Sequence, residues 1–448
     1  MENPAVKFRL QMYLLLAIGL VLLICPFVSA DTPAVCFGEN VFNCTNSRCT
    51  WEVSFSRPFF TPANCSNDYE RFNNVKVLLK YPNSIVFPDS GHVVGTWTMM
   101  YNQGMELRLG SFSFFFFFDF EQTRHGVISH CDRTIQGWYH NKEAEQFGCA
   151  SAKRLDYSPP TPWQSNIIEL SGNTNSKPTF TTTKYDFDTP VNGRIVVHEK
   201  KSIDQSRQFF DPALHPPDLP TMWDWSLLKV LSPPKHTLRC GSCYVFAFTY
   251  ALEARFKIKS MGAIKPTLSD QMLVDCNYYA QKCRGGFSFA VSRFVLENGV
   301  VASRAYKYTG EEGTCRNLVE EERFFVKDYY PVNGYYGNHE YAEDAIMREL
   351  YENGPVTASL FIPRDGSFQQ YKEGIYYNPE QPDRHGFYVE ISHEVTIIGW
   401  GISPDNRKYW KVLNSWGANW GEWGTFKIPR GIDHLGIESY VVAALPLV

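Results

Sequence analysis

Short runs of alternating apolar and polar residues characterise the chain between residues 31 and 152. Two of them, Val75–Tyr81 and Met105–Leu109, have the partial period of two that is typical of β-strands, and turn-forming residues lie beside each run. The segment Phe112–Phe120 contains seven phenylalanines, five of them consecutive, which we interpret as a strand buried on both faces rather than as a ligand site. The pattern therefore predicts a β-rich domain.

The pattern changes twice after this region. Residues 153–217 are polar, contain no cysteine and lack a clear period, which is typical of a linker or a removable segment. From residue 218 onward, helical periods precede strand-like runs, and this order favours an α+β domain with two subdomains that face one another. The expected helices are 243–260, 268–275, 289–298 and 342–353, and the expected strands include 394–399 and 409–413.

Residues 1–30 have the pattern of a secretory signal peptide. Lys7 and Arg9 precede an apolar run at 13–24, and Val28-Ser29-Ala30 provides the small residues of a cleavage site. The run is shorter than the ~20 residues that a membrane-spanning helix needs, so we favour cleavage after Ala30 over an uncleaved membrane anchor. A chain processed in this way reaches the lysosome or the extracellular space.

Composition narrows the class of protein. The length of 448 residues predicts two or three domains. A mean hydropathy of −0.29 with 20% charged residues excludes a polytopic membrane protein and a disordered chain. The 43 basic and 47 acidic residues give no overall attraction to nucleic acid. Two N-glycosylation sequons, at Asn43 and Asn64, suit a secreted surface.

The cysteines indicate a reactive site. Of the twelve, Cys25 would leave with the signal peptide, and an odd number in an oxidising compartment indicates one thiol with a separate role. Cys240-Gly241-Ser242-Cys243 precedes an apolar helical pattern, so Cys243 lies on a first turn, where the positive end of the helix macrodipole lowers the pKa of a thiol. These residues alone leave three other interpretations open: a structural pair, a thioredoxin-type redox pair, or a zinc site with Cys276 and Cys283.

One of the eleven histidines stands at the start of a predicted core strand. Ser392-His393-Glu394 leads into that strand, and a second strand ends at Asn414, with Trp416 close behind. A thiolate nucleophile needs a base that a third group holds in place. The Asn414 side-chain oxygen can accept from one imidazole nitrogen, which leaves the other nitrogen to face the sulfur. The Trp416 indole can shield that hydrogen bond from water.

Together and in this order, the three motifs resemble those of papain-like cysteine peptidases over residues 218–448. The resemblance implies the papain-like α+β fold of two subdomains. It also implies Cys243 as the nucleophile, His393 as general base and acid, and Asn414 as the group that orients the histidine. By the same resemblance Trp416 covers the hydrogen bond between Asn414 and His393.

The upstream sequence resembles the cathepsin C family of dipeptidyl peptidases. The similar segments are Asp31-Thr32-Pro33-Ala34, Tyr101-Asn102-Gln103-Gly104, Gly137-Trp138 and residues 219–225. This resemblance implies that residues 31–152 form an antiparallel β-barrel exclusion domain, which blocks the far end of the cleft. After cleavage at Ala30, the carboxylate of the new terminal residue, Asp31, would pair with the free amino group of a peptide or protein substrate. The cleft would then release dipeptides.

Further expectations come from the same resemblance. Residues 153–217 correspond to an activation segment that is excised, a second cut falls near residues 381–384, and the mature enzyme is a homotetramer. The substrate pocket would include Gly285, Gly286 and Ile437. Phe287, Phe289 and Tyr336 would surround a bound chloride, although the family has a tyrosine where this chain has Phe289. No metal cofactor is expected.

A second departure from the family concerns the oxyanion hole. The family has a glutamine six residues before the nucleophile, whereas this chain has Thr237, whose hydroxyl is shorter. Loss of one oxyanion donor typically lowers turnover by ~10²–10³-fold. Two classes of function are therefore weighed: a cysteine-type dipeptidyl peptidase, which we favour, and a catalytically impaired papain-like binding module.

The resemblance also suggests disulfide pairs. In the peptidase region it pairs Cys240 with Cys283 and Cys276 with Cys315. In the barrel it pairs Cys36 with Cys131 and Cys65 with Cys149. Cys44 and Cys49 then remain for each other, a pair that the resemblance does not supply.

Overall fold

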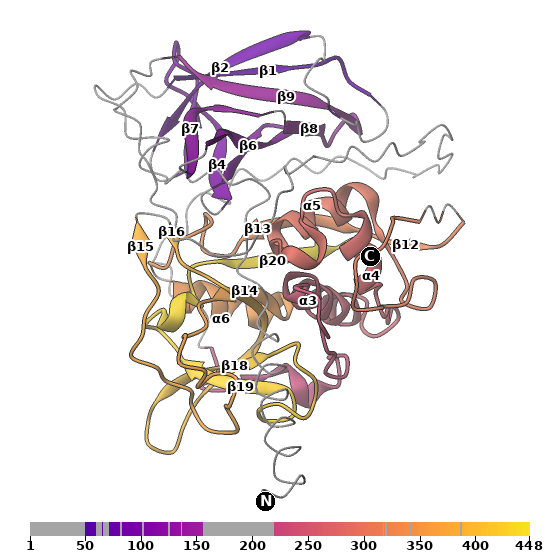
Figure 1. Ribbon diagram of the computed structural model, residues 1–448, viewed down its shortest axis with the longest axis vertical. Helices are drawn as coiled ribbons and strands as arrows, with labels where there is room; N and C mark the ends of the chain where they lie inside the picture. Colours follow the sequence, from indigo (N-terminus) through magenta and orange to yellow (C-terminus); the bar gives the residue numbers. More distant parts are fainter. Residues whose placement is uncertain are drawn as a thin grey trace, which may run out of the picture.

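The computed structural model describes two neighbouring domains, shown in Figure 1. The residues described are 50–59, 65, 71–80, 83–100, 103–123, 126–135, 137–155, 219–316, 318, 320–340, 342–385 and 388–448. Several predicted features lie outside these residues, namely the signal peptide, Asp31, Cys36, Cys44, Cys49, both sequon asparagines and nearly all of the segment 153–217. Among the described residues, no helix is both long enough and apolar enough to cross a membrane.

The N-terminal domain is a closed antiparallel barrel, as expected. Its strands are β1 (Thr50–Phe55), β2 (Asn73–Lys80), β3 (Ser84–Val86), β4 (Val93–Met100), β5 (Gly104–Leu109), β6 (Phe112–Thr123), β7 (Gly126–Thr134), β8 (Gly137–Asn141) and β9 (Gln146–Arg154). Pairing of β1 with β9 closes the sheet, so neither strand is left with an open edge. Strand β9 continues two residues past the predicted boundary at 152, because Lys153 and Arg154 pair with β1.

The phenylalanine run forms the strand between the two hydrophobic cores. On β6, Phe114, Phe116 and Phe118 point into the barrel core. Phe115 and Phe117 point the other way and belong to a core of the C-terminal domain. Residues 114–118 are each at most 4% exposed. The prediction of a strand buried on both faces is confirmed, and the alternation of side chains along a strand explains it.

The C-terminal domain combines helices with a seven-stranded sheet of order β13-β20-β14-β17-β18-β19, in which β10 pairs with β17. Its helices are η2 (Trp225–Leu228), α3 (Cys243–Lys259), α4 (Asp270–Cys276), η3 (Lys282–Arg284), α5 (Ser288–Asn298), α6 (Ala342–Asn353) and η4 (His434–Gly436). Its strands are β10 (Trp223–Asp224), β11 (Val300–Val301), β12 (Arg323–Phe324), β13 (Val326–Pro331), β14 (Val356–Leu360), β15 (Arg384–His385), β16 (Tyr388–Val389), β17 (His393–Ile402), β18 (Lys408–Leu413), β19 (Thr425–Pro429) and β20 (Val441–Pro446).

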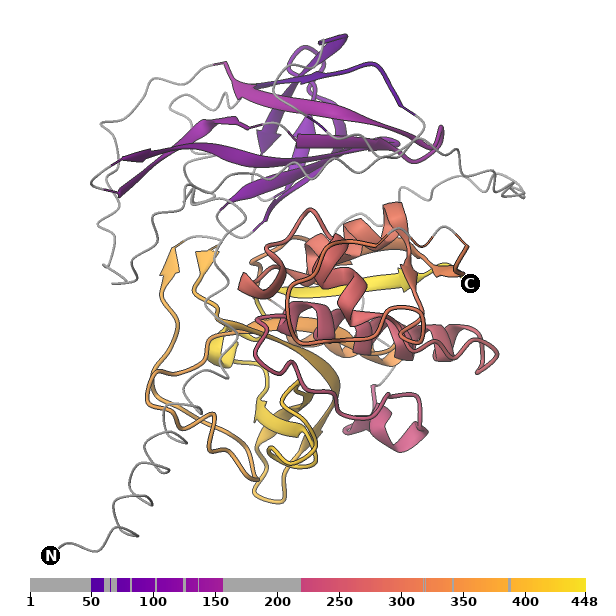
Figure 2. The ribbon, with the colours of Figure 1, turned by 45° about the vertical axis from the view of Figure 1, so that its right-hand side comes forward.

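This domain has the predicted papain-like division into two subdomains. Helices α3, α4 and α5 build one core, and the sheet with α6 builds the other, as Figure 2 illustrates. Helix α3 is buried along almost its whole length, which explains its apolar sequence. Helix α4 begins at Asp270 rather than at residue 268, because the Ser269 side chain caps it by accepting from the Met272 amide at 3.0 Å.

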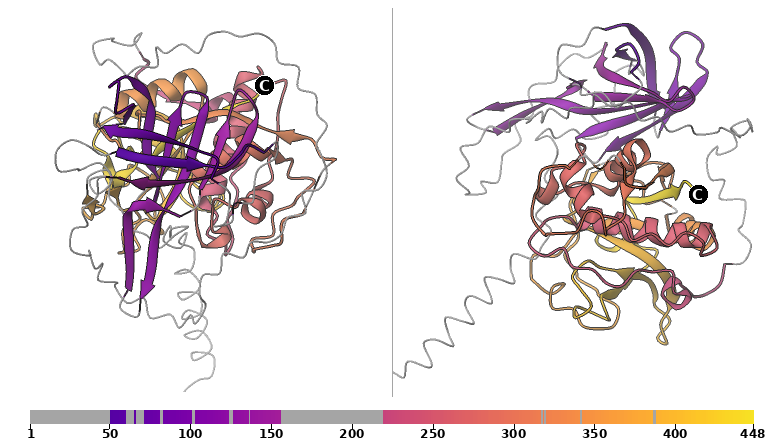
Figure 3. Two further views of the ribbon diagram at one scale, coloured as in Figure 1. Left: turned by 90° about the horizontal axis from the view of Figure 1, so that it is seen from above. Right: turned by 90° about the vertical axis from the view of Figure 1, so that its right-hand side faces the viewer.

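The barrel lies against the peptidase domain, as Figure 3 shows from above and from the side. Glu106 on β5 is the centre of the polar contact. It accepts a hydrogen bond from the Tyr329 hydroxyl at 2.6 Å and pairs with Arg293 of α5 at 3.5 Å. Burial alone would raise the pKa of Glu106, but Arg108, Arg293 and Tyr329 together lower it. The contact therefore holds an ionised carboxylate between the domains.

Three predicted disulfides are present: Cys65–Cys149, Cys240–Cys283 and Cys276–Cys315. Cys131 is also disulfide-bonded, to a partner outside the described residues. The pairs Cys36–Cys131 and Cys44–Cys49 therefore stay predictions.

Candidate active site

Cys243 is the first residue of α3 and is 1% exposed. The structure differs here from the expectation of a thiol, because Cys243 forms a disulfide with a partner outside the described residues. In this state the Cys243 sulfur is oxidised, and it becomes a nucleophile only after reduction.

The strand that carries His393 packs against α3. The Thr396 hydroxyl of β17 donates to the Ala247 carbonyl of α3 at 3.0 Å. Ala247 lies about one helical turn beyond Cys243, and Thr396 lies three residues beyond His393. This hydrogen bond therefore fixes the start of the helix relative to the start of the strand.

His393 and Asn414 form the predicted hydrogen bond. His393 Nε2 donates to Asn414 Oδ1 at 2.8 Å, and the backbone amide of Ser415 donates to the same oxygen at 2.8 Å. These contacts fix the amide and direct its oxygen at the imidazole. Among the described residues, His393 Nδ1 has no hydrogen-bond partner. The ring thus has one nitrogen held and one available for proton transfer.

His393 lies in a buried environment. The residue is fully buried, and burial lowers its pKa to about 4, although the hydrogen bond to Asn414 opposes this change. The Trp416 ring lies 5.1 Å from the imidazole, centroid to centroid. Trp416 is therefore placed to shield the ring from water, as predicted. Because Cys243 is in a disulfide here, no thiolate is present to raise the histidine pKa.

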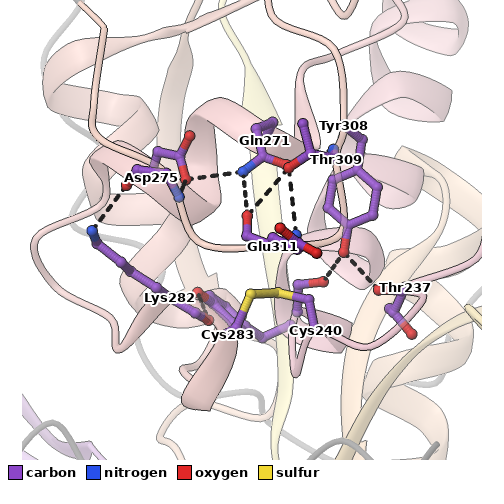
Figure 4. Close-up of a disulfide and its surroundings, with 12 residues drawn as sticks. Thr237, Cys240, Gln271, Asp275, Lys282, Cys283, Tyr308, Thr309 and Glu311 are labelled. Atoms are coloured by element: carbon purple, nitrogen blue, oxygen red, sulfur yellow. Dashed lines mark hydrogen bonds between the residues drawn. A yellow bond between two sulfur atoms is a disulfide. The ribbon is translucent and has the colours of Figure 1, made fainter.

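Thr237 lies beside this pair. Its backbone amide donates to the Ser415 carbonyl at 3.1 Å, and its carbonyl accepts from the Tyr308 hydroxyl at 2.7 Å. The Tyr308 hydroxyl also lies 2.8 Å from Ser242 Oγ, directly before Cys243. Figure 4 shows Tyr308 directed at Thr237. Thr237 thus lies within a backbone that is anchored on both sides, and its place in an oxyanion hole stays a prediction.

The predicted pocket glycines Gly285 and Gly286, which we call the glycine wall, follow a segment that is tied to the loop before Cys243. The Cys240–Cys283 disulfide joins the two segments (Figure 4), and the Gly241 amide donates to the Cys283 carbonyl at 2.8 Å. Gly285 has a φ of 126°, a conformation that favours glycine. A Cβ at Gly286 would lie 2.7 Å from the Tyr244 ring, so only glycine allows this approach.

The other predicted pocket residues lie in two places. Ile437 is fully buried after η4, in the core of the sheet subdomain. Phe287, Phe289 and Tyr336 line one small cavity at the barrel interface, and the rings of Phe289 and Tyr336 lie 5.3 Å apart. Asp31 lies outside the described residues, so its proposed contact with substrate stays a prediction.

Sequence reasoning missed two supports of the site. Tyr308 holds both Thr237 and Ser242, although it lies 66 residues beyond Ser242 in the chain. Lys235 anchors the same loop by ion pairs to Glu253 at 3.1 Å and to Asp270 at 3.2 Å. No local signal distinguishes a tyrosine or a lysine with such a role, because the contacts join distant segments.

Asn414→Ala tests the orienting role of the amide. The substitution leaves the imidazole without the acceptor that fixes it, so we expect kcat of the reduced enzyme to fall on the order of 10²-fold with little change in KM. Steady-state kinetics on a peptide substrate measures this. Asn333→Ala, which removes an amide that donates to the backbone carbonyls of Asn338 and Glu340 and does not contact His393, serves as the control. An Asn414→Ala enzyme with normal kcat would refute the role.

Comparison with known proteins agrees with this geometry. The profile of the papain family cysteine protease matches residues 219–445, and that of the cathepsin C exclusion domain matches residues 31–154. The first match covers just over half of the chain, and the chain therefore belongs to the papain family of cysteine proteases. Its combination of a peptidase domain with an exclusion domain is that of cathepsin C.

Individual relatives extend the likeness. Cathepsin C of Schistosoma mansoni is 29% identical over 478 aligned residues, which cover 96% of this chain and 98% of the relative. Dipeptidyl aminopeptidase 1 of Plasmodium falciparum is 27% identical over 283 residues, which cover 45% of this chain and 40% of the relative. Among solved structures, bromelain from Ananas comosus aligns with a TM-score of 0.43 and 29% identity, over 50% of this chain and 98% of bromelain.

Proposed function

We propose that this protein is a cysteine-type exopeptidase that removes dipeptides from the free N-termini of peptides and proteins. The observation that carries the proposal is the 2.8 Å hydrogen bond from His393 Nε2 to Asn414 Oδ1, at the start of the strand that packs on the Cys243 helix. The similarity to cathepsin C over nearly the whole chain supports the choice of reaction.

The proposed reaction begins with reduced Cys243. His393 Nδ1 takes the thiol proton, the sulfur attacks the scissile carbonyl carbon, and the negative oxygen faces the Cys243 amide and Thr237. The C–N bond then breaks as His393 returns the proton to the leaving amine, and a thioester remains. Water, deprotonated by His393, attacks the thioester, which releases the dipeptide acid and restores the thiol.

The dipeptide length is proposed to come from the barrel. A carboxylate at Asp31, freed by cleavage after Ala30, would pair with the substrate ammonium at a fixed distance from the sulfur. Excision of most of 153–217 and assembly into a homotetramer, in the lysosome or outside the cell, belong to the same proposal.

The proposed cut near residues 381–384 falls in a tethered segment. Gln381 accepts from the Leu435 amide at 3.1 Å, and Arg384 pairs with Asp433 at 2.7 Å. A cut there would leave both new ends attached to the loop that carries Ile437.

A binding module with little turnover is the second candidate. It is favoured by the disulfide at Cys243 and by the threonine at the oxyanion position. The two candidates make different predictions for the protein after the Cys243 disulfide is reduced: the peptidase would turn over substrate, and the binding module would not. Reduced, processed protein is incubated at mildly acidic pH with a dipeptidyl fluorogenic amide. The peptidase proposal expects steady release of fluorophore, and labelling of Cys243 by an alkylating probe without release would support the binding module.

Thr237→Gln tests the oxyanion position. A glutamine amide reaches further than the threonine hydroxyl and can donate to the developing oxyanion, so we expect kcat to rise roughly 10-fold or more. Thr237→Ala is the matched control, and it should resemble the wild type if the hydroxyl contributes little. A glutamine variant no faster than wild type would show that the oxyanion is already fully stabilised by other donors.

A further inference from the structure

A buried carboxyl group, that of Glu394, lies near the residues of the predicted chloride site. Phe289 and Tyr336 pack together at the start of α5, beside the barrel strand that carries Phe115 and Phe117. The side chain of Glu394 enters this region from β17. Glu394 is 1% exposed and directly follows His393, so the two side chains point to opposite faces of the strand.

The Glu394 carboxyl occupies the start of α5. The amide of Ser288, the first residue of that helix, donates to Oε2 at 3.0 Å. Ser359, which lies opposite Glu394 in the register of β14 and β17, donates its hydroxyl to Oε1 at 3.1 Å. Amides in the first turn of a helix have no partner within the helix, and the macrodipole there favours an anion. The protein's own carboxyl group therefore already holds the donor that an anion would use.

Burial and hydrogen bonding shift the pKa of Glu394 in opposite directions. Burial raises the pKa of Glu394 to about 7, and hydrogen bonds from Ser288 and Ser359 oppose the change. No basic side chain of the described residues forms an ion pair with it. After burial itself, the charge of Glu394 is the largest cause that raises the pKa of Tyr336. The carboxyl thus lies within electrostatic reach of the tyrosine that the resemblance assigns to chloride.

A chloride does not fit beside this group. When Glu394 is ionised, two buried anions would repel one another. When it is protonated, it still accepts from the Ser288 amide, so that donor stays occupied. We propose that the Glu394 carboxyl group takes the place of chloride at the start of α5, so that the protein needs no halide for stability or turnover.

The same contact gives Glu394 a positioning role. Helix α5 directly follows the glycine wall of the substrate pocket, and Glu394 directly follows the catalytic histidine. The Ser288–Glu394 hydrogen bond therefore ties the pocket wall to the strand that carries the base. This role rests on the proposed function, whereas halide independence of the fold does not.

Thermal unfolding of the full chain tests the proposal separately from activity. The melting temperature is measured while sodium chloride replaces sodium acetate at constant ionic strength and pH. Wild-type protein should give the same value throughout. Glu394→Ala, which vacates the anion position, should show a saturable rise with chloride or bromide, and line broadening of ³⁵Cl in NMR should report the bound ion. Glu394→Gln, which keeps the side chain's size, should stay halide-independent, as should the control Ser359→Ala.

Two results would overturn the proposal. One is a saturable chloride dependence of the wild-type melting temperature, and the other is a Glu394→Ala protein that folds but binds no halide. If Glu394→Ala fails to fold in acetate, Glu394→Ser replaces it in the same titration, and folding that chloride restores would support the proposal. An inactive wild-type enzyme would contradict the proposed function without affecting these outcomes.

Discussion

Replacing Cys243 with alanine is expected to lower kcat/KM of the reduced enzyme by roughly 10⁴-fold or more. The substitution removes the only atom assigned to form the thioester, and His393 alone cannot provide the covalent path. Cys243 is the first residue of α3, and alanine is a strong helix former, so we expect the variant to fold. Kinetics on a dipeptidyl amide after reduction measures the loss.

A control is needed to separate loss of the nucleophile from the loss of stability that removal of any cysteine can cause. The double variant Cys276→Ala/Cys315→Ala removes a disulfide of the same domain and leaves Cys243 untouched. It should be less stable yet keep its turnover per folded molecule. If Cys243→Ala retained activity within tenfold of wild type, the assignment of the nucleophile would be wrong.

Arg293→Met is expected to give the largest loss of stability, about 3–5 kcal/mol. Arg293 is 1% exposed and pairs with Glu297 at 3.0 Å and with Glu106 at 3.5 Å. Its removal leaves the buried Glu297 without a counter-charge, and Glu106 with Arg108 alone. Its guanidinium also lies 4.9 Å from the Phe115 ring, at the contact between barrel and peptidase domain. Urea unfolding, followed by fluorescence, measures the change.

A matched control exists on the surface. Arg407 pairs with Asp405 at 2.6 Å, but both side chains are more than half exposed. Arg407→Met should therefore leave the unfolding midpoint unchanged, because solvent screens such pairs. The double variant Arg293→Met/Glu106→Gln should recover part of the loss. A wild-type midpoint for Arg293→Met would contradict the account of the domain interface.

Much of the fold follows from local pattern. The helix at 342–353 is predicted to the residue, and the phenylalanine run is identified as a doubly buried strand, because period and composition report burial directly. The hydrogen bond between His393 and Asn414 can also be predicted from the sequence, since both residues lie in recognisable motifs 21 residues apart.

The rest depends on contacts between distant segments. Arg293 and Glu106 are 187 residues apart, and Glu394 and Ser288 are 106 apart, so no local window contains either pair. In the sequence, Glu394 is an ordinary polar residue in a core strand. Only the structure shows that the start of α5 donates a hydrogen bond to it. The sequence predicts a free thiol at Cys243, whereas the structure has this cysteine in a disulfide, because a disulfide joins segments that no local window brings together.

The most direct test of the proposed activity follows the products of one unlabelled peptide by mass spectrometry. Processed, reduced protein, with its N-terminus verified by sequencing, is incubated with the peptide and with its N-acetylated form. We expect a ladder of products, each shorter by two N-terminal residues, and no cleavage of the acetylated peptide. Internal cleavage of both peptides, or no cleavage of either while Cys243 reacts with an alkylating probe, would contradict the proposal.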